Sequence, residues 1–112
     1  MLTSSPSGRP VLISVISQAT AVTIHTAHAT AKEEVYLWVT NTSAAAVTLN
    51  LLINDGSIVD PDDYIVKTLS LPANSPPLPI LTGQTFTSSM VIAAFASVNN
   101  ALTYQGFINR VI

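Results

Sequence analysis

Apolar residues recur at every second position over short segments of this chain, and this period constrains the fold more than any other feature. The clearest segment is Ala46–Asn54. Its apolar and polar residues alternate as Val47, Thr48, Leu49, Asn50 and Leu51. Because successive side chains of a strand point to opposite faces, this alternation predicts a strand with one buried face. No segment of useful length has the 3.6-residue period of a helix, so the sequence predicts an all-β domain.

Turn-forming residues divide the chain into short strands. The expected strands cover residues 10–16, 19–26, 34–41, 46–54, 64–71, 78–81, 90–96 and 102–112. Prolines prevent regular pairing through most of 72–79, and Thr82–Gly83 is expected to form a turn. The strand Met90–Ala96 is apolar on both faces, which predicts cover on two sides. Seven or eight short strands predict a single antiparallel β-sandwich of jelly-roll-like architecture.

Charged residues are scarce: the 112 residues include four basic and six acidic ones, or 9%. An average soluble domain has about a quarter of its residues charged. This deficit predicts that much of the outer surface is buried against other chains, as in a homo-oligomer such as a trimer. The basic residues are well separated, which argues against nucleic-acid binding, and the absence of cysteine excludes disulfide and zinc-thiolate sites. Apolar runs end well before the roughly 18 residues of a membrane span, and Val11–Ile16 is too short for the core of a signal peptide.

The first ten residues differ from the rest in composition. Residues 1–10 are rich in Ser, Pro and Gly and are expected to form an extended arm, with the sandwich domain covering 11–112. The groups that can make contacts are Leu2, Pro6, Arg9 and Pro10. We expect the arm to attach to a neighbouring subunit; the alternative is that it folds back on its own domain.

Several segments together carry a family resemblance. They are 35–41 (VYLWVTN), 47–51 (VTLNL), 71–75 (LPANS), 80–84 (ILTGQ), the Ala-rich strand through Phe95, and 104–107 (YQGF). In this order they resemble the small β-sandwich virion proteins of tailed bacteriophages, over roughly residues 20–112. The resemblance implies a structural role without catalytic residues or a cofactor. The members of this family are decoration, cement or fibre-associated subunits, so the resemblance implies an assembly role on the particle. We expect partners such as the major capsid protein and favour the capsid surface over the tail, although the sequence does not separate the two.

Two clusters of side chains are candidate metal sites. Asp55, Asp60, Asp62 and Asp63 offer oxygen ligands of the kind that Ca²⁺ prefers. Their spacing does not match an EF-hand loop, and a solvated acidic turn is the favoured interpretation.

His25 and His28 lie on opposite faces of an extended strand. They meet only if the chain turns at Ala27, with Glu33 or Glu34 as a third ligand. Two surface or interface histidines are the favoured interpretation, and no metal site is predicted.

Three aromatic residues leave a choice between function classes. Tyr36, Trp38 and Tyr104 form either interface and packing anchors or a sugar-stacking platform, and the first is favoured. No Gly-x-Ser-x-Gly motif is present, and no enzyme activity is expected. The predicted function is therefore a capsid decoration or cement subunit that uses Tyr36, Trp38 and the arm as contacts. A neck, tail or fibre-associated component is the alternative within this class, and a carbohydrate-binding adhesion module is the alternative outside it.

Overall fold

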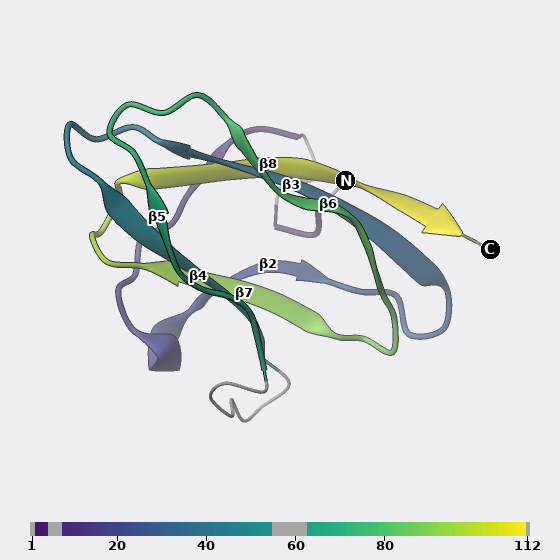
Figure 1. Cartoon of the computed structure of the whole chain (residues 1–112). Coiled ribbons are helices and arrows are strands. Elements are labelled where there is room, and N and C mark those ends of the chain that lie inside the picture. The colour runs from purple at the N-terminus through teal and green to yellow at the C-terminus, as the bar shows by residue number, and fades with distance from the viewer. Residues whose placement is uncertain (1, 5–7, 55–62, 112) are drawn as a thin grey trace.

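The chain folds as two antiparallel sheets that pack face to face (Figure 1). The computed structural model describes residues 2–4, 8–54 and 63–111. The first sheet contains, in spatial order, β1 (Val11–Leu12), β8 (Leu102–Val111), β3 (Lys32–Asn41) and β6 (Leu78–Phe86). The second contains β2 (Val22–Thr26), β7 (Val91–Ala96), β4 (Val47–Ile53) and β5 (Tyr64–Leu71). The predicted all-β sandwich is confirmed, and within the described ranges no helix is long and apolar enough to cross a membrane.

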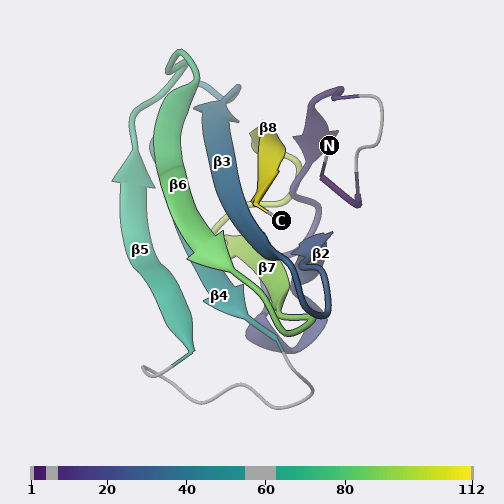
Figure 2. The ribbon, with the colours of Figure 1, turned by 90° about the vertical axis from the view of Figure 1, so that its right-hand side faces the viewer.

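The strand pairs are nested along the chain. β1 pairs with β8, β2 with β7, β3 with β6 and β4 with β5, always antiparallel. The further pairs β3 with β8 and β4 with β7 join these strand pairs into the two sheets. Figure 2 shows the resulting layers, with β8, β3 and β6 in one and β7, β4 and β5 in the other. This is the strand order of a jelly roll, as the sequence predicted.

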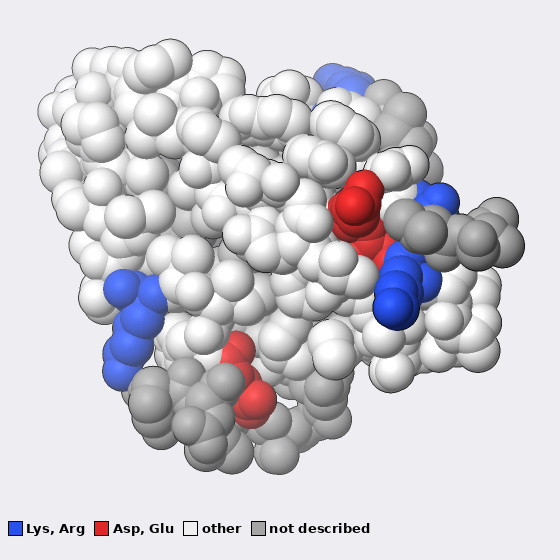
Figure 3. All heavy atoms as spheres, turned by 45° about the vertical axis from the view of Figure 1, so that its right-hand side comes forward, with Lys and Arg blue, Asp and Glu red and all other residues white. Residues whose placement is uncertain are grey.

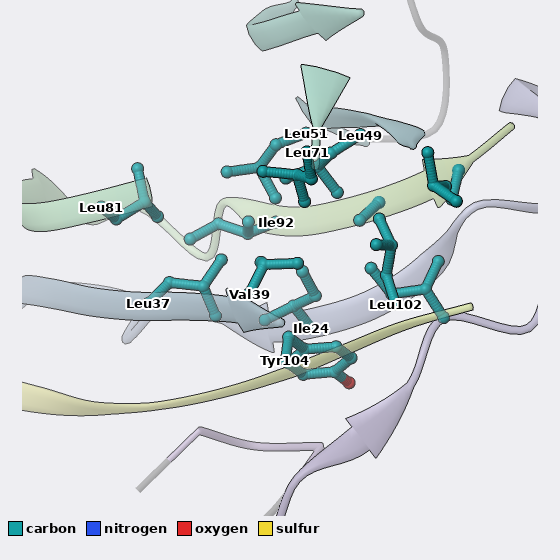
Figure 4. Packing of buried hydrophobic residues seen from close by; sticks show 14 of the residues in the cluster. Ile24, Leu37, Val39, Leu49, Leu51, Leu71, Leu81, Ile92, Leu102 and Tyr104 are labelled. Atoms are coloured by element: carbon teal, nitrogen blue, oxygen red, sulfur yellow. The ribbon is translucent and has the colours of Figure 1, made fainter. Parts of the chain in front are cut away.

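The hydrophobic core lies between the layers and follows from the alternation of the strands. Val35, Leu37 and Val39 of β3 belong to the same buried cluster as Leu49 and Leu51 of β4. Figure 4 shows Leu37 and Val39 pointing into this core, where Leu49 and Leu51 also lie. All five side chains are fully buried. Each such side chain contributes about 1.5–3 kcal/mol through its removal from water, so the packing of the two inner faces is the main source of stability.

β6 is longer than the predicted strand at 78–81. It continues to Phe86, through the position where a turn at Thr82–Gly83 was expected. Gly83 has a φ of 109°, and the pairing of β3 with β6 shifts register between Val35 and Tyr36. The residue therefore forms a β-bulge inside the strand. Pro79 also lies inside β6, which is possible because β6 is an edge strand and needs backbone donors on one side only.

The first two strands are shorter than predicted. β1 and β2 span Val11–Leu12 and Val22–Thr26, and a 3-10 turn at Gln18–Thr20 separates them. The hydroxyl of Ser17 accepts a hydrogen bond from the amide of Ala19 and so caps this turn.

Residues 2–4 belong to the fold of their own domain. The side chain of Leu2 is 1% exposed and lies in the core cluster. The Thr3 amide donates to Nδ1 of His25 at 3.0 Å, and the Ser4 amide donates to the carbonyl oxygen of Ile24 at 3.3 Å. The expectation that Leu2 contacts a neighbouring subunit is therefore wrong. The physical reason is that its single apolar side chain is buried in the core of its own domain, which holds this polar segment against the sandwich.

Candidate functional site

Three aromatic rings form a cluster on the outer face of the first sheet. Tyr36 and Trp38 come from β3, and Phe107 comes from the neighbouring strand β8. The ring centroids of Tyr36 and Phe107 are 4.6 Å apart with an interplanar angle of 11°. The centroids of Trp38 and Phe107 are 5.8 Å apart at 28°. We call these three residues the aromatic cluster.

The backbone of the two strands sets the positions of these rings. Tyr36 and Trp38 alternate with the buried residues of β3, so they point away from the core. Tyr36 is directly opposite Phe107 in the register of β3 with β8. Directly opposite residues are close enough for cross-strand aromatic pairing, and Phe107 packs against both rings of β3.

Two glycines make room around Tyr36. A Cβ on Gly83 would lie 3.1 Å from the Tyr36 hydroxyl oxygen, and a Cβ on Gly106 would overlap the Tyr36 carbonyl oxygen. Gly83 also has the positive φ that other residues rarely adopt. The bulge in β6 and the close approach of β8 to β3 therefore depend on residues without a side chain.

The stacking decides what the aromatic cluster presents to solvent. The rings of Tyr36 and Phe107 are nearly parallel with centroids 4.6 Å apart, so each ring covers part of one face of the other. Phe107 nevertheless remains 46% exposed. The cluster thus offers a raised apolar surface rather than a set of flat, open ring faces.

Polar side chains flank the aromatic cluster, and the charged Glu34 lies on the same face of β3 by alternation. Gln105 and Asn109 of β8 lie on the same face as Phe107 by alternation, and both are exposed. Asn109 donates a hydrogen bond to Oε1 of Glu34 at 2.8 Å. Charged side chains are also sparse in the view of Figure 3, where they gather in a few places and leave a wide uncharged area.

The predicted interface and platform residues separate in the structure. Tyr36 and Trp38 share the aromatic cluster, whereas Tyr104 is 1% exposed and lies in the core. Burial raises the pKa of Tyr104, and its hydrogen bond with the Ser4 hydroxyl partly offsets that rise. The three-residue platform of Tyr36, Trp38 and Tyr104 is therefore wrong. Phe107 is the third ring of the aromatic cluster instead. The sequence could have indicated this, because alternation along β8 places Phe107 and Tyr104 on opposite faces of the strand.

The remaining arm residues differ in what the structure describes. Arg9 and Pro10 are exposed, and their role as contacts stays a prediction. Pro6 lies outside the described residues.

A second cluster of polar side chains closes one end of the sandwich. His25 of β2 and Glu33 of β3 are both buried, and His25 Nε2 lies 2.8 Å from Glu33 Oε1. Arg110 of β8 donates through Nε and Nη2 to Glu33 Oε2, at 3.0 and 2.8 Å. The backbone amide of His28 also donates to Glu33 Oε1, at 3.0 Å. Burial by itself raises the pKa of the Glu33 carboxyl, but these hydrogen bonds from His25, Arg110 and His28 hold it below the ordinary value of 4.5.

This second cluster is not arranged as a metal site. The ring of His28 accepts hydrogen bonds from the amides of Thr30 and Ala31, at 3.1 and 2.9 Å, instead of joining His25. In the described part of the chain, no three His, Asp or Glu side chains are placed to hold a metal ion. Three of the four aspartates proposed as a cation loop lie outside the described residues, namely Asp55, Asp60 and Asp62.

Comparison with known proteins adds no relative. No protein-family model, curated protein or solved structure matches this chain. The resemblance to bacteriophage virion proteins therefore remains an expectation from the sequence, and the case for a function depends on the geometry of the two clusters.

Proposed function

We propose that this chain is a non-enzymatic structural subunit of a tailed-bacteriophage virion, namely a capsid decoration or cement protein. In this proposal it forms homo-oligomers and seats on the major capsid protein at the capsid surface. The observation that carries the proposal is the aromatic cluster on the outer face of the first sheet, where Phe107 is 46% exposed and most of the flanking side chains are polar and uncharged. A neck, tail or fibre position uses the same surface and differs only in the neighbouring protein.

The outer face has the composition of a protein interface. The centre of an interface is depleted in charge and enriched in Tyr, Trp and Phe, and its rim is polar. The aromatic cluster supplies such a centre. The exposed amide side chains of Gln105 and Asn109 supply the polar rim beside it. A partner that covers Phe107 removes a ring that is 46% exposed from water. A subunit that binds the assembled shell and not its separated parts stabilises the shell by mass action.

A carbohydrate-binding module is the second candidate, and the same surface is the reason. Exposed aromatic rings beside amide side chains also suit a sugar. The stacking of Tyr36 on Phe107 favours the structural role, because sugars stack on open ring faces and this stack covers part of two of them.

One exchange at the aromatic cluster tests the proposal. Phe107→Ser is compared with Leu69→Ser, which changes a side chain 39% exposed on β5 in the other sheet. Sedimentation velocity at micromolar concentration should show an oligomer for the natural chain and for Leu69→Ser. Phe107→Ser should weaken self-association by roughly 30-fold, the equivalent of a hot-spot residue of about 2 kcal/mol. Circular dichroism confirms that both variants are folded.

The outcomes separate the two candidates. A natural chain that stays monomeric and binds oligosaccharides on a glycan array, with binding lost in Phe107→Ser, establishes the carbohydrate module instead. Equal self-association of both variants contradicts the proposed surface. Density for this sandwich in an electron-microscopy map of the virion decides between capsid and tail.

A further inference from the structure

The second polar cluster does more than close the end of the sandwich, because it holds residues 2–4 in place. We propose that His25 is a pH-sensitive latch: its neutral ring keeps the segment Leu2–Ser4 docked, and its protonation releases this segment. This inference is independent of the proposed virion role.

The docked segment has one apolar anchor and a small set of hydrogen bonds. Leu2 is buried in the core. The Thr3 amide donates to Nδ1 of His25 at 3.0 Å, and Oγ1 of Thr3 accepts from the Thr26 amide at 2.9 Å. The hydroxyls of Ser4 and Tyr104 are hydrogen-bonded at 2.7 Å. Of these contacts, the one at His25 depends on which ring nitrogens carry a proton.

The partners of His25 define its protonation state. A backbone amide is a donor, so Nδ1 must carry a lone pair to accept from Thr3. The carboxylate of Glu33 is an acceptor, so Nε2 must carry the hydrogen that lies between them at 2.8 Å. We therefore assign the docked state to the neutral ring with its proton on Nε2.

Protonation turns the contact with Thr3 into a clash of donors. The new N–H on Nδ1 would face the Thr3 amide at 3.0 Å, at a site where His25 is 2% exposed and water has little access. One of the two groups must move. His25 stays, because the negative charge of Glu33 attracts the charged ring and Glu33 itself is fixed by Arg110. The segment Leu2–Ser4 is then the part that leaves.

The charged and titratable groups around His25 come from three strands and the loop between β2 and β3. Glu33 of β3 favours the charged ring, and Arg110 of β8 opposes it through the other carboxylate oxygen. His28, between β2 and β3, also accepts backbone amides at Nδ1 and is a second group that must be neutral there. Tyr104 of β8 holds Ser4 and stays uncharged in this range, since its pKa is raised. Histidine changes charge between about pH 5 and 8, while Glu33 remains ionised because its pKa is lowered.

The direction and size of the effect follow from proton linkage. The docked state binds one proton fewer at His25 than the released state, so docking is favoured at higher pH. Once the ring titrates, the ratio of docked to released segment falls by up to tenfold for each unit of pH.

Nuclear magnetic resonance of the full chain between pH 8 and 5 tests the latch. The methyl groups of Leu2 and the amide of Thr3 report docking, and the ring resonances of His25 report its titration. In the natural chain both should change with one midpoint. In His25→Asn, Oδ1 still accepts from Thr3 but does not titrate, so the segment should stay docked throughout. His28→Asn is the matched control and should keep the pH dependence of the natural chain.

Three results would overturn the latch. One is that the segment stays docked in the natural chain while the His25 ring titrates. This measurement needs no variant, so it tests the proposal even if His25→Asn does not fold. The second is release of the segment at acidic pH in a folded His25→Asn. Release that is lost in His28→Asn alone would assign the switch to His28 and equally refute the proposal.

Discussion

Replacing Leu2 by Ala measures whether residues 2–4 stabilise the domain to which they belong. Truncating a fully buried Leu to Ala costs about 2–5 kcal/mol. Leu2 is 1% exposed, but few other contacts hold its segment, so the segment can leave instead of keeping a cavity. We therefore expect a loss at the lower end, about 2–3 kcal/mol. At about 4 °C per kcal/mol for a domain of this size, the Tm should fall by about 8–12 °C.

Urea denaturation at pH 7.5, followed by circular dichroism, provides the free energy of unfolding. Leu12→Ala is the control, because Leu12 is 46% exposed on β1 and its truncation should change stability by no more than about 0.5 kcal/mol. Equal losses in the two variants would refute the reasoning. Residues 2–4 would then be an arm whose contacts lie on another subunit, as the composition of 1–10 first indicated.

Three further predictions follow from the same structure. Glu33→Gln should lose about 1.5–3 kcal/mol at pH 7, because charge-assisted hydrogen bonds are weakened. Since the pKa of Glu33 is lowered from 4.5, its stabilisation is complete above that pH and is lost as the pH falls further, so urea titrations of variant and natural chain should converge in acid. Tyr104→Phe should lose about 0.5–1.5 kcal/mol with the Ser4 bond. Because the pKa of Tyr104 is raised above 10.0, the natural chain should lose stability as the pH rises past 10, and thermal melts of the variant should lack this contribution. Gly106→Ala should cost about 3 kcal/mol or more in urea titrations, because its Cβ overlaps the backbone of Tyr36.

The sequence predicted the strands well because their signal is local. The alternation in 46–54 does not depend on any other part of the chain, and β4 spans Val47–Ile53. The bulge at Gly83 was missed because its cause, the ring of Tyr36, lies on another strand. Turn propensity was the only information at Thr82–Gly83, and it favoured a turn.

The candidate site was predicted in part for a similar reason. Alternation places Phe107 and Tyr104 on opposite faces of β8, but the register that sets Phe107 against Tyr36 is a property of the paired strands. Glu33 was considered near His25, whereas Arg110 is 77 residues further along the chain and was not. Leu2 was assigned to an arm because composition averages over ten residues and gives a single apolar side chain little weight.

The nested pairing of the strands also determines how the domain can fold. β4 with β5 is the pair closest in sequence, and each surrounding pair closes a longer stretch of chain, ending with β1 and β8. Closing long loops costs entropy before the contacts are gained, so topologies of this kind fold slowly. β8 lies between β1 and β3. Until it arrives, β3 has an open edge that can pair with another chain. The strand that carries Phe107 on its outer face thus also covers this edge of β3 in the folded domain.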